Sequence, residues 1–254
     1  MTHTLIQISD LHLFDDPDAV LKNVRTWGTF ERVLNRLEAS YAHADAIIIT
    51  GDLAHDERFE TYEMLQQRLG PLFSRVWVVP GNHDHRLSMA AIFSQKGLPG
   101  GKTIGFQHTV GGWQLLGLDS QLTGETAGEL DADQLAWLTA TLKRSTATPT
   151  LVFLHHPPIS VGSPWLDAIG LKNAEALGEI LRGAPHVRGV FFGHIHQEFE
   201  ASIGTIECYA TPSTGVQFTP ETETLQVDTR PPGFRVITLG GETFETHVVR
   251  VLGD

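Results

Sequence analysis

Aspartate, asparagine and histidine residues recur in this chain directly after short apolar runs, and these residue types can bind metal ions. The stretch Pro80-Gly81-Asn82-His83-Asp84 is the clearest case, because it follows the apolar run Val76-Trp77-Val78-Val79. Such a run predicts a buried strand, and Pro80 and Gly81 predict that the strand ends in a tight turn. The turn would present an amide oxygen beside an imidazole, although a Gly-Asn turn by itself is common.

Four other apolar runs end in the same way. Together with the first run they supply the candidate site residues Asp10, His12, Asp52, Asn82, His83, His155, His194 and His196. Ligands of open α/β sheets gather outside the carboxyl ends of the strands, so we expect these side chains to meet. Positions two apart in an extended strand point the same way, which predicts that Asp10 converges with His12 and His194 with His196. Carboxylate, imidazole and amide donors without thiolates favour Mn, Fe, Zn or Co.

The elements that must position these residues alternate between strands and helices, which favours an α/β layered architecture. The predicted strands cover residues 5–9, 45–50, 76–79, 104–110, 113–118, 150–154, 187–192, 206–210, 234–239 and 243–251. The predicted helices cover residues 24–38, 57–69, 87–94, a segment capped by Asp131, and a segment capped by Asn173 that stops at Gly183. Residues 211–233 show no clear period and are expected to be a covering loop or a mobile segment.

Composition limits the class of protein. The 254 residues are 41% hydrophobic and 19% charged, and we expect them to form one domain spanning residues 1–254. A net charge of −12 argues against broad nucleic-acid binding, which needs a basic surface. The sequence holds no apolar run long enough to span a membrane and shows no export signal. These features, with the single cysteine Cys208, predict a cytoplasmic protein.

The ordered blocks D-x-H, G-D, G-N-H-D, H and G-H-x-H resemble the pattern of the calcineurin-like metallophosphoesterase superfamily. The rest of the chain resembles the bacterial class III 3′,5′-cyclic AMP phosphodiesterases in stretches such as 118–121, 165–167, 210–214 and 232–235. One departure is Gly215, where some relatives are expected to have cysteine. The resemblance implies a four-layer sandwich of two mixed β-sheets flanked by helices. It also suggests a homodimer.

The resemblance further implies two metal ions. One would be bound by Asp10, His12, Asp52 and His196, and the other by Asp52, Asn82, His155 and His194. Two such ions, about 4 Å apart, can turn a bridging water into a hydroxide that attacks phosphorus. The expected reaction is the hydrolysis of 3′,5′-cyclic AMP to 5′-AMP.

His83 is the expected catalytic residue, as acid or electrostatic stabiliser for the leaving oxygen, because it directly follows the ligand Asn82. Substrate contacts are expected from Asn82, His83 and His196. His156 is expected to be structural. His55 and Asp56 follow the Gly-Asp turn and could line the pocket, although ordinary turn polarity also explains them. Tryptophan and phenylalanine residues at regular spacing are expected in the core.

Three other functions are rivals to cyclic AMP hydrolysis. The same chemistry could act on a different phosphodiester or pyrophosphate, such as a glycerophosphodiester or a 2′,3′-cyclic nucleotide, because the motifs leave the nucleoside pocket unspecified. A protein-binding scaffold on this fold should have lost ligands, and none is missing. A nuclease is disfavoured by the acidic balance.

Overall fold

Two mixed β-sheets pack face to face in the computed structural model, which describes residues 2–93 and 103–253. The first sheet has the strand order β15-β14-β1-β4-β5. Its strands are β1 (His3–Ile8), β4 (Ala46–Thr50), β5 (Val76–Val79), β14 (Gly233–Leu239) and β15 (Phe244–Arg250). Strands β1, β4 and β5 run parallel, so their carboxyl ends lie at one edge of the sheet.

The second sheet has the strand order β10-β11-β9-β8-β7-β6. Its strands are β6 (Phe106–Val110), β7 (Trp113–Gly117), β8 (Thr150–Phe153), β9 (Val187–Phe192), β10 (Phe199–Ile203) and β11 (Ile206–Ala210). The four inner strands run parallel, and the edge strands β6 and β10 run antiparallel to their neighbours. Gly111 and Gly112 join β6 to β7 with φ values of 57° and 86°, which confirms the predicted double-glycine hairpin.

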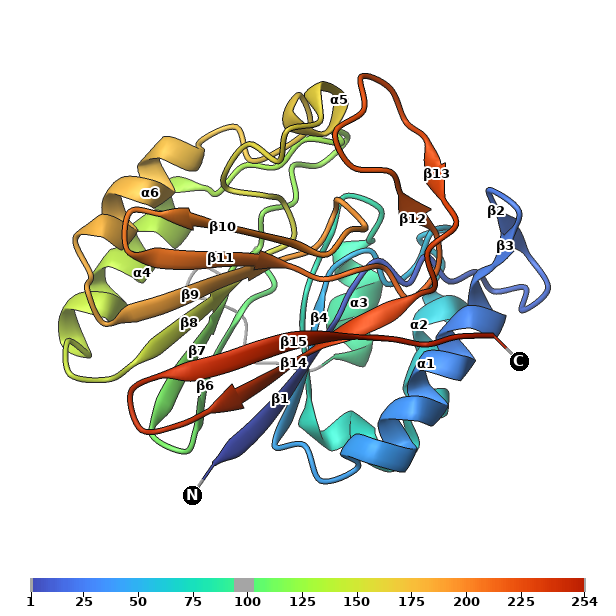
Figure 1. Ribbon diagram of the computed structural model, residues 1–254, viewed down its shortest axis with the longest axis horizontal. Helices are drawn as coiled ribbons and strands as arrows, with labels where there is room; N and C mark the ends of the chain where they lie inside the picture. Colours follow the sequence, from blue (N-terminus) through green and yellow to red (C-terminus); the bar gives the residue numbers. More distant parts are fainter. Residues whose placement is uncertain (1, 94–102, 254) are drawn as a thin grey trace.

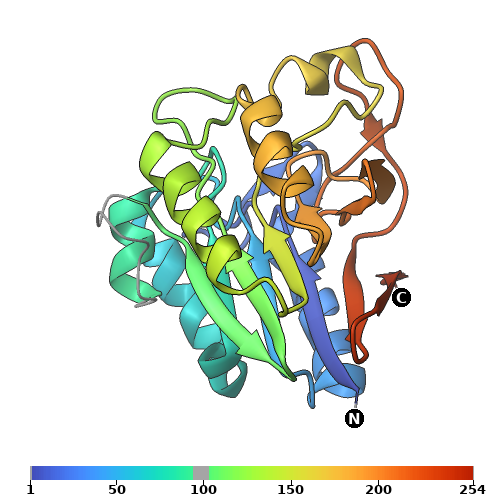
Figure 2. The same ribbon diagram turned by 90° about the vertical axis from the view of Figure 1, so that its left-hand side faces the viewer.

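Helices cover the outer face of each sheet (Figures 1 and 2). The helices are α1 (Thr26–Tyr41), α2 (Phe59–Leu69), the 3-10 helix η1 (Gly70–Arg75), α3 (Arg86–Ile92), α4 (Ala132–Arg144), α5 (Pro164–Asp167) and α6 (Ala174–Arg182). Helices α1 to α3 lie on the first sheet, and α4 and α6 lie on the second. The predicted four-layer sandwich is therefore confirmed.

The apolar run of β4 shows why the sheets stack. Ile47 and Ile49 face the helices and share a cluster with Phe30 of α1. Ala46 and Ile48 point to the opposite face, where they share a second cluster with Phe153 between the two sheets. A strand that buries both faces reads as a continuous apolar run, as expected for a parallel strand covered on two sides.

Several short strands were missed by the sequence prediction. The hairpin of β2 (Val20–Leu21) and β3 (Val24–Arg25) takes up the first residues of the predicted helix at 24–38. Strand β10 was not predicted, and β12 (Gln217–Phe218) pairs with β13 (Val227–Asp228) inside segment 211–233. The last residue of the predicted helix at 87–94 lies outside the described residues.

The two predicted helix caps differ in outcome. The Asp131 carboxylate accepts a hydrogen bond from the Gln134 amide at 2.7 Å, as the capping pattern predicts. Asn173 stands at the N-cap position of α6, as predicted, but its side chain makes no cap hydrogen bond. Instead it bonds the backbone of Leu130, donating to the carbonyl at 2.7 Å and accepting from the amide at 3.0 Å.

Among the described residues, no helix has the length and apolar character needed to cross a membrane.

Candidate metal centre

The eight predicted site residues lie at the carboxyl ends of five strands, and the structure brings all eight together. Strands β1, β4 and β5 of the first sheet and β8 and β9 of the second end at the same place. The residues that follow these strands are Asp10 and His12 after β1, Asp52 after β4, Asn82 and His83 after β5, His155 after β8, and His194 and His196 after β9. Both sheets therefore contribute to one centre.

One group of donor atoms surrounds His12. Its Nε2 lies 3.2 Å from Nε2 of His196 and 3.5 Å from Oδ2 of Asp52. Nε2 of His196 lies 3.3 Å from Oδ1 of Asp10. Atoms that bind one ion at about 2.1 Å lie roughly 3.0 to 3.4 Å apart in octahedral or tetrahedral geometry. These spacings therefore suit a shared cation.

A second group surrounds Asn82. Its Oδ1 lies 3.1 Å from Nδ1 of His194 and 3.3 Å from Nε2 of His155. The same Nε2 of His155 lies 3.6 Å from Oδ2 of Asp52, the oxygen that also faces His12. One carboxylate oxygen thus stands between the two groups.

The nitrogens that face inward carry lone pairs. Nδ1 of His155 lies 2.7 Å from the Thr50 carbonyl, and Nδ1 of His196 lies 2.7 Å from the Val216 carbonyl. A carbonyl oxygen only accepts, so each Nδ1 must carry a proton, and in the neutral ring that binds a metal each Nε2 is then bare. Bare nitrogens and carboxylates that face one another at this range repel unless a cation lies between them. The donor set therefore fits bound metal ions, and two triplets of these residues, Asp10-His12-His196 and Asp10-Asp52-His155, have donor atoms close enough to hold one.

The electrostatics favour the neutral form of two of these imidazoles, those of His12 and His194. Burial, reinforced by the neighbouring histidines, lowers the pKa of His12 and of His194 well below the usual range. Burial also acts to lower the pKa of His155, but Asp52 and Asp10 outweigh it and raise that pKa. Burial acts to raise the pKa of Asp10, whereas His196 and His155 outweigh it and lower that pKa. Neutral imidazole and ionised carboxylate are the forms that bind metals.

The backbone at this centre is strained. Five of the candidate ligands have positive φ, at 54° for Asp10, 46° for His12, 52° for Asp52, 68° for His194 and 53° for His196. Left-handed backbone costs about 1–2 kcal/mol for a residue that is not glycine. The predicted convergence of Asp10 with His12 is found, but the predicted reason was wrong, because neither residue is extended. Such strain clusters at functional sites.

Asp84 holds the turn that carries Asn82 and His83. Its buried carboxylate accepts hydrogen bonds from the amides of Gly81 at 2.9 Å, Leu53 at 3.0 Å and Ala54 at 3.2 Å, and from the Tyr62 hydroxyl at 3.0 Å. Burial, with Asp52 adding to it, raises the pKa of Asp84 to about 7. Asp84 therefore ties the turn after β5 to the turn after β4.

His83 faces a cavity rather than the middle of the donor cluster. Its amide donates to Oδ1 of Asp52 at 2.9 Å, which fixes the backbone beside the shared carboxylate. The cavity has a volume of about 340 Å³, and its lining includes Asp52, Asn82, His83, His194 and His196. His156 stays buried, with its Nδ1 2.8 Å from the Ser120 hydroxyl and its Nε2 3.0 Å from the Thr126 carbonyl. The structural role expected of His156 agrees with these contacts.

Part of the cavity lining, here called the apolar wall, was missed by the sequence prediction. It includes Trp165, Ile169, Val216 and Phe218. Trp165 is half-buried beside this cavity, and the expectation that regularly spaced aromatic residues lie in the core did not cover it. Trp165 follows a Gly-Ser-Pro stretch and is not part of a periodic segment. That position was the available sign that its ring lies outside the core. His55 also lines the cavity.

Comparisons with known proteins give a consistent result. The family described as calcineurin-like phosphoesterase matches residues 3–198. The chain is 36% identical to a 3′,5′-cyclic adenosine monophosphate phosphodiesterase CpdA from Vibrio vulnificus over 92% of this chain and 85% of that protein. It is 35% identical to the protein of the same name from Escherichia coli over 98% of this chain and 90% of that one. A dimetal phosphatase from Danio rerio shares the fold with a TM-score of 0.69 at 16% identity, covering 98% of this chain and 99% of that one.

Proposed function

Because the chain belongs to the calcineurin-like phosphoesterase family, we propose that it is a binuclear-metal phosphodiesterase that hydrolyses 3′,5′-cyclic AMP to 5′-AMP. The observation that carries the proposal is the pair of donor groups that share Oδ2 of Asp52 beside a cavity. The names of the relatives from Vibrio vulnificus and Escherichia coli support the choice of substrate.

The proposed ligands follow the two donor groups. One ion is assigned to Asp10, His12, Asp52 and His196, and the other to Asp52, Asn82, His155 and His194. Such a pair of ions supplies a nucleophile from water at neutral pH and stabilises charge on the phosphoryl oxygens. Nitrogen and oxygen donors without thiolate favour Fe, Mn, Zn or Co. Bound cations would also create a local positive charge that attracts an anionic substrate, on a chain whose net charge is −12.

His83 is the proposed catalytic residue. Its backbone is fixed beside Asp52, and its ring lines the cavity, where it can reach a bound phosphodiester. In this position it donates a proton or a hydrogen bond to the 3′ oxygen of the ribose as the bond to phosphorus breaks. Asn82 and His196 are proposed to contact the phosphate in addition to binding metal.

The apolar wall of the cavity favours a substrate with a base. Trp165 and Phe218 lie with ring centroids 5.3 Å apart in an edge-to-face arrangement. A nucleoside base can stack on or pack against such a surface, whereas a glycerophosphodiester has no group of this kind. A 2′,3′-cyclic nucleotide carries the same base and is the second candidate.

Hydrolysis by purified protein tests the proposal. Protein loaded with Mn²⁺ is assayed with 3′,5′-cyclic AMP, 2′,3′-cyclic AMP, bis(4-nitrophenyl) phosphate and 4-nitrophenyl phosphate, with Asp52→Asn as the control that should lose activity. We expect 5′-AMP as the product and the highest kcat/KM for 3′,5′-cyclic AMP. A preference for the monoester, or no hydrolysis by fully loaded protein, would contradict the proposed function.

Three broader expectations belong to the same proposal. We propose that residues 1–254 form one domain, since both sheets supply residues to one centre. A cytoplasmic location and the absence of nucleic-acid and membrane partners remain predictions, supported by the acidic charge and the single cysteine. A homodimer is a further prediction, which light scattering of the purified protein can check.

A further inference from the structure

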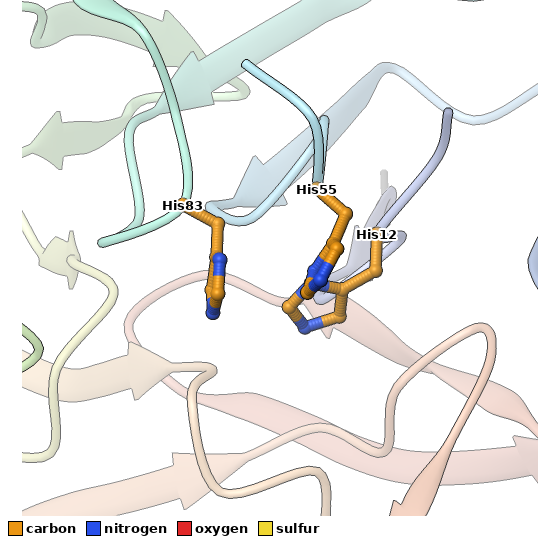
Figure 3. Close-up of side chains that lie close together, drawn as sticks. All are labelled: His12, His55 and His83. Atoms are coloured by element: carbon orange, nitrogen blue, oxygen red, sulfur yellow. The ribbon is translucent and has the colours of Figure 1, made fainter. Parts of the chain in front are cut away.

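His55 lies against both the candidate ligand His12 and the candidate acid His83, and the three rings form one group (Figure 3). Its Nδ1 is 3.1 Å from Nδ1 of His12. Its ring stacks on the ring of His83, with centroids 4.6 Å apart and planes 25° apart. The amide of His55 donates to the Leu13 carbonyl at 2.8 Å, which fixes the backbone of His55 beside the segment that carries His12.

The proton on each nitrogen follows from these contacts. Nε2 of His12 faces His196 and Asp52, so it must be bare to bind a cation, and Nδ1 of His12 therefore carries the proton. That N–H donates to Nδ1 of His55, which is then the acceptor. A neutral imidazole has one N–H, so the proton of His55 lies on Nε2.

We propose that His55 is a positioning residue for this centre. By accepting the His12 N–H, it holds the His12 ring with Nε2 turned toward the metal position. By stacking on His83, it holds the catalytic ring at the cavity. The inference rests on the metal assignment in the proposed function.

Two of the other histidine ligands have a hydrogen-bond partner of the same kind. His155 and His196 are each held by a backbone carbonyl, those of Thr50 and Val216. For His12, the partner of Nδ1 is a side chain, so a substitution can remove the partner without touching the backbone. Hydrogen-bond partners that hold a metal ligand without touching the metal contribute about 10- to 100-fold to metal affinity.

A third metal ion is the competing explanation, because nitrogens of His12, His55 and His83 lie within 4.8 Å of one another. This arrangement would require Nδ1 of His12 to lose its proton while Nε2 binds another ion. The tautomers derived above leave no bare nitrogen on His12 for a further ion. A third bound ion would therefore overturn the proposal.

Two variants separate the two contacts of His55. His55→Phe keeps an aromatic ring against His83 but removes the acceptor. His55→Asn places an amide oxygen near the position of Nδ1 but removes the ring. His43→Phe is the matched control, because His43 is exposed and precedes β4, at the end of that strand away from Asp52.

Zn²⁺ affinity, measured by competition with a chromophoric chelator, is the first readout. We expect His55→Phe to bind one of two Zn²⁺ ions about 10- to 100-fold more weakly, and His55→Asn and His43→Phe to bind both within a few-fold of the unsubstituted protein. Equal affinities in all four proteins would overturn the proposal. This readout does not depend on the substrate, so failure of the cyclic AMP assay leaves it interpretable.

The second readout needs no variant. Long-range ¹H–¹⁵N spectra of the Zn²⁺-loaded protein report which imidazole nitrogen carries a proton. We expect His12 protonated at Nδ1 and His55 protonated at Nε2. A His55 ring protonated at Nδ1, or a third equivalent of Zn²⁺ bound to this group, would contradict the assignment even if the variants failed to fold.

Discussion

Several candidate ligands and His83 are each held in place by a neighbouring group, and the atom that would bind metal or substrate is left free. The His83 amide is tied to Asp52, but its ring stays at the cavity, stacked on His55. Replacing His83 with alanine should therefore remove the acid without removing a ligand. We expect kcat for cyclic AMP to fall about 100-fold or more, with metal content per chain unchanged by atomic spectroscopy. A His83→Ala variant that lost its metal would show a ligand role instead.

The residue types of this centre could be predicted from sequence, because each one directly follows an apolar run. The nitrogen that each imidazole presents could not be predicted, since that depends on carbonyls such as those of Thr50 and Val216, which are distant in sequence. The left-handed backbone of Asp10 and His12 could not be predicted from the sequence either, because aspartate and histidine adopt it only when surrounding contacts compensate its cost. The position of His55 depends on the packing of two loops.

At the scale of elements, the turn after β4 must pass very close to its neighbours. Gly51 has a φ of 94°, and a Cβ there would lie 2.4 Å from Nδ1 of His155 and 2.7 Å from the Gly81 amide. Gly124 has a φ of 80° but has no atom within 4 Å of a Cβ. Alanine at Gly124 should suffer only the backbone strain, whereas alanine at Gly51 should suffer strain and a clash.

We therefore expect Gly51→Ala to lower the free energy of unfolding by about 2–5 kcal/mol, and Gly124→Ala by about 1–2 kcal/mol. Urea unfolding of the metal-free proteins measures both values and separates packing from metal binding. Equal losses in the two variants would mean that the turn after β4 can move to accommodate a Cβ.

Helix α5 places Trp165 at the cavity wall, where its indole N–H donates to the Thr222 hydroxyl at 3.3 Å. If this wall holds the base, Trp165→Ala should raise KM for cyclic AMP about tenfold or more, corresponding to a stacking loss of about 1–3 kcal/mol. KM for bis(4-nitrophenyl) phosphate, which lacks a nucleoside, should change much less. A similar rise for both diesters would argue against a base-binding wall.

The main strands could be predicted, because runs such as 46–49 and 190–192 are apolar and buried on both faces. The short strands could not, since β12 and β13 have two residues each and are defined by their pairing. Segment 211–233 was therefore predicted as a covering loop or a mobile segment. It supplies Val216 and Phe218 to the cavity, and Phe218 stacks on His196 with centroids 4.1 Å apart.

At the scale of the whole molecule, the two sheets meet where the candidate ligands lie. Bound ions would therefore hold β1, β4 and β5 to β8 and β9. If one site is filled at a free metal concentration a hundredfold above its Kd, removing that metal with EDTA should lower Tm by roughly 5–10 °C. In Asp52→Asn, Tm should be nearly insensitive to EDTA. An equal response of the two proteins to EDTA would place the stabilising ions elsewhere.

Anomalous diffraction from crystals loaded with Mn²⁺ tests the central claim most directly. The account predicts two peaks about 3.5–4 Å apart, one among Asp10, His12 and His196 and the other among Asn82, His155 and His194, with Oδ2 of Asp52 bound to both. A single peak, or two peaks that do not share Asp52, would contradict it.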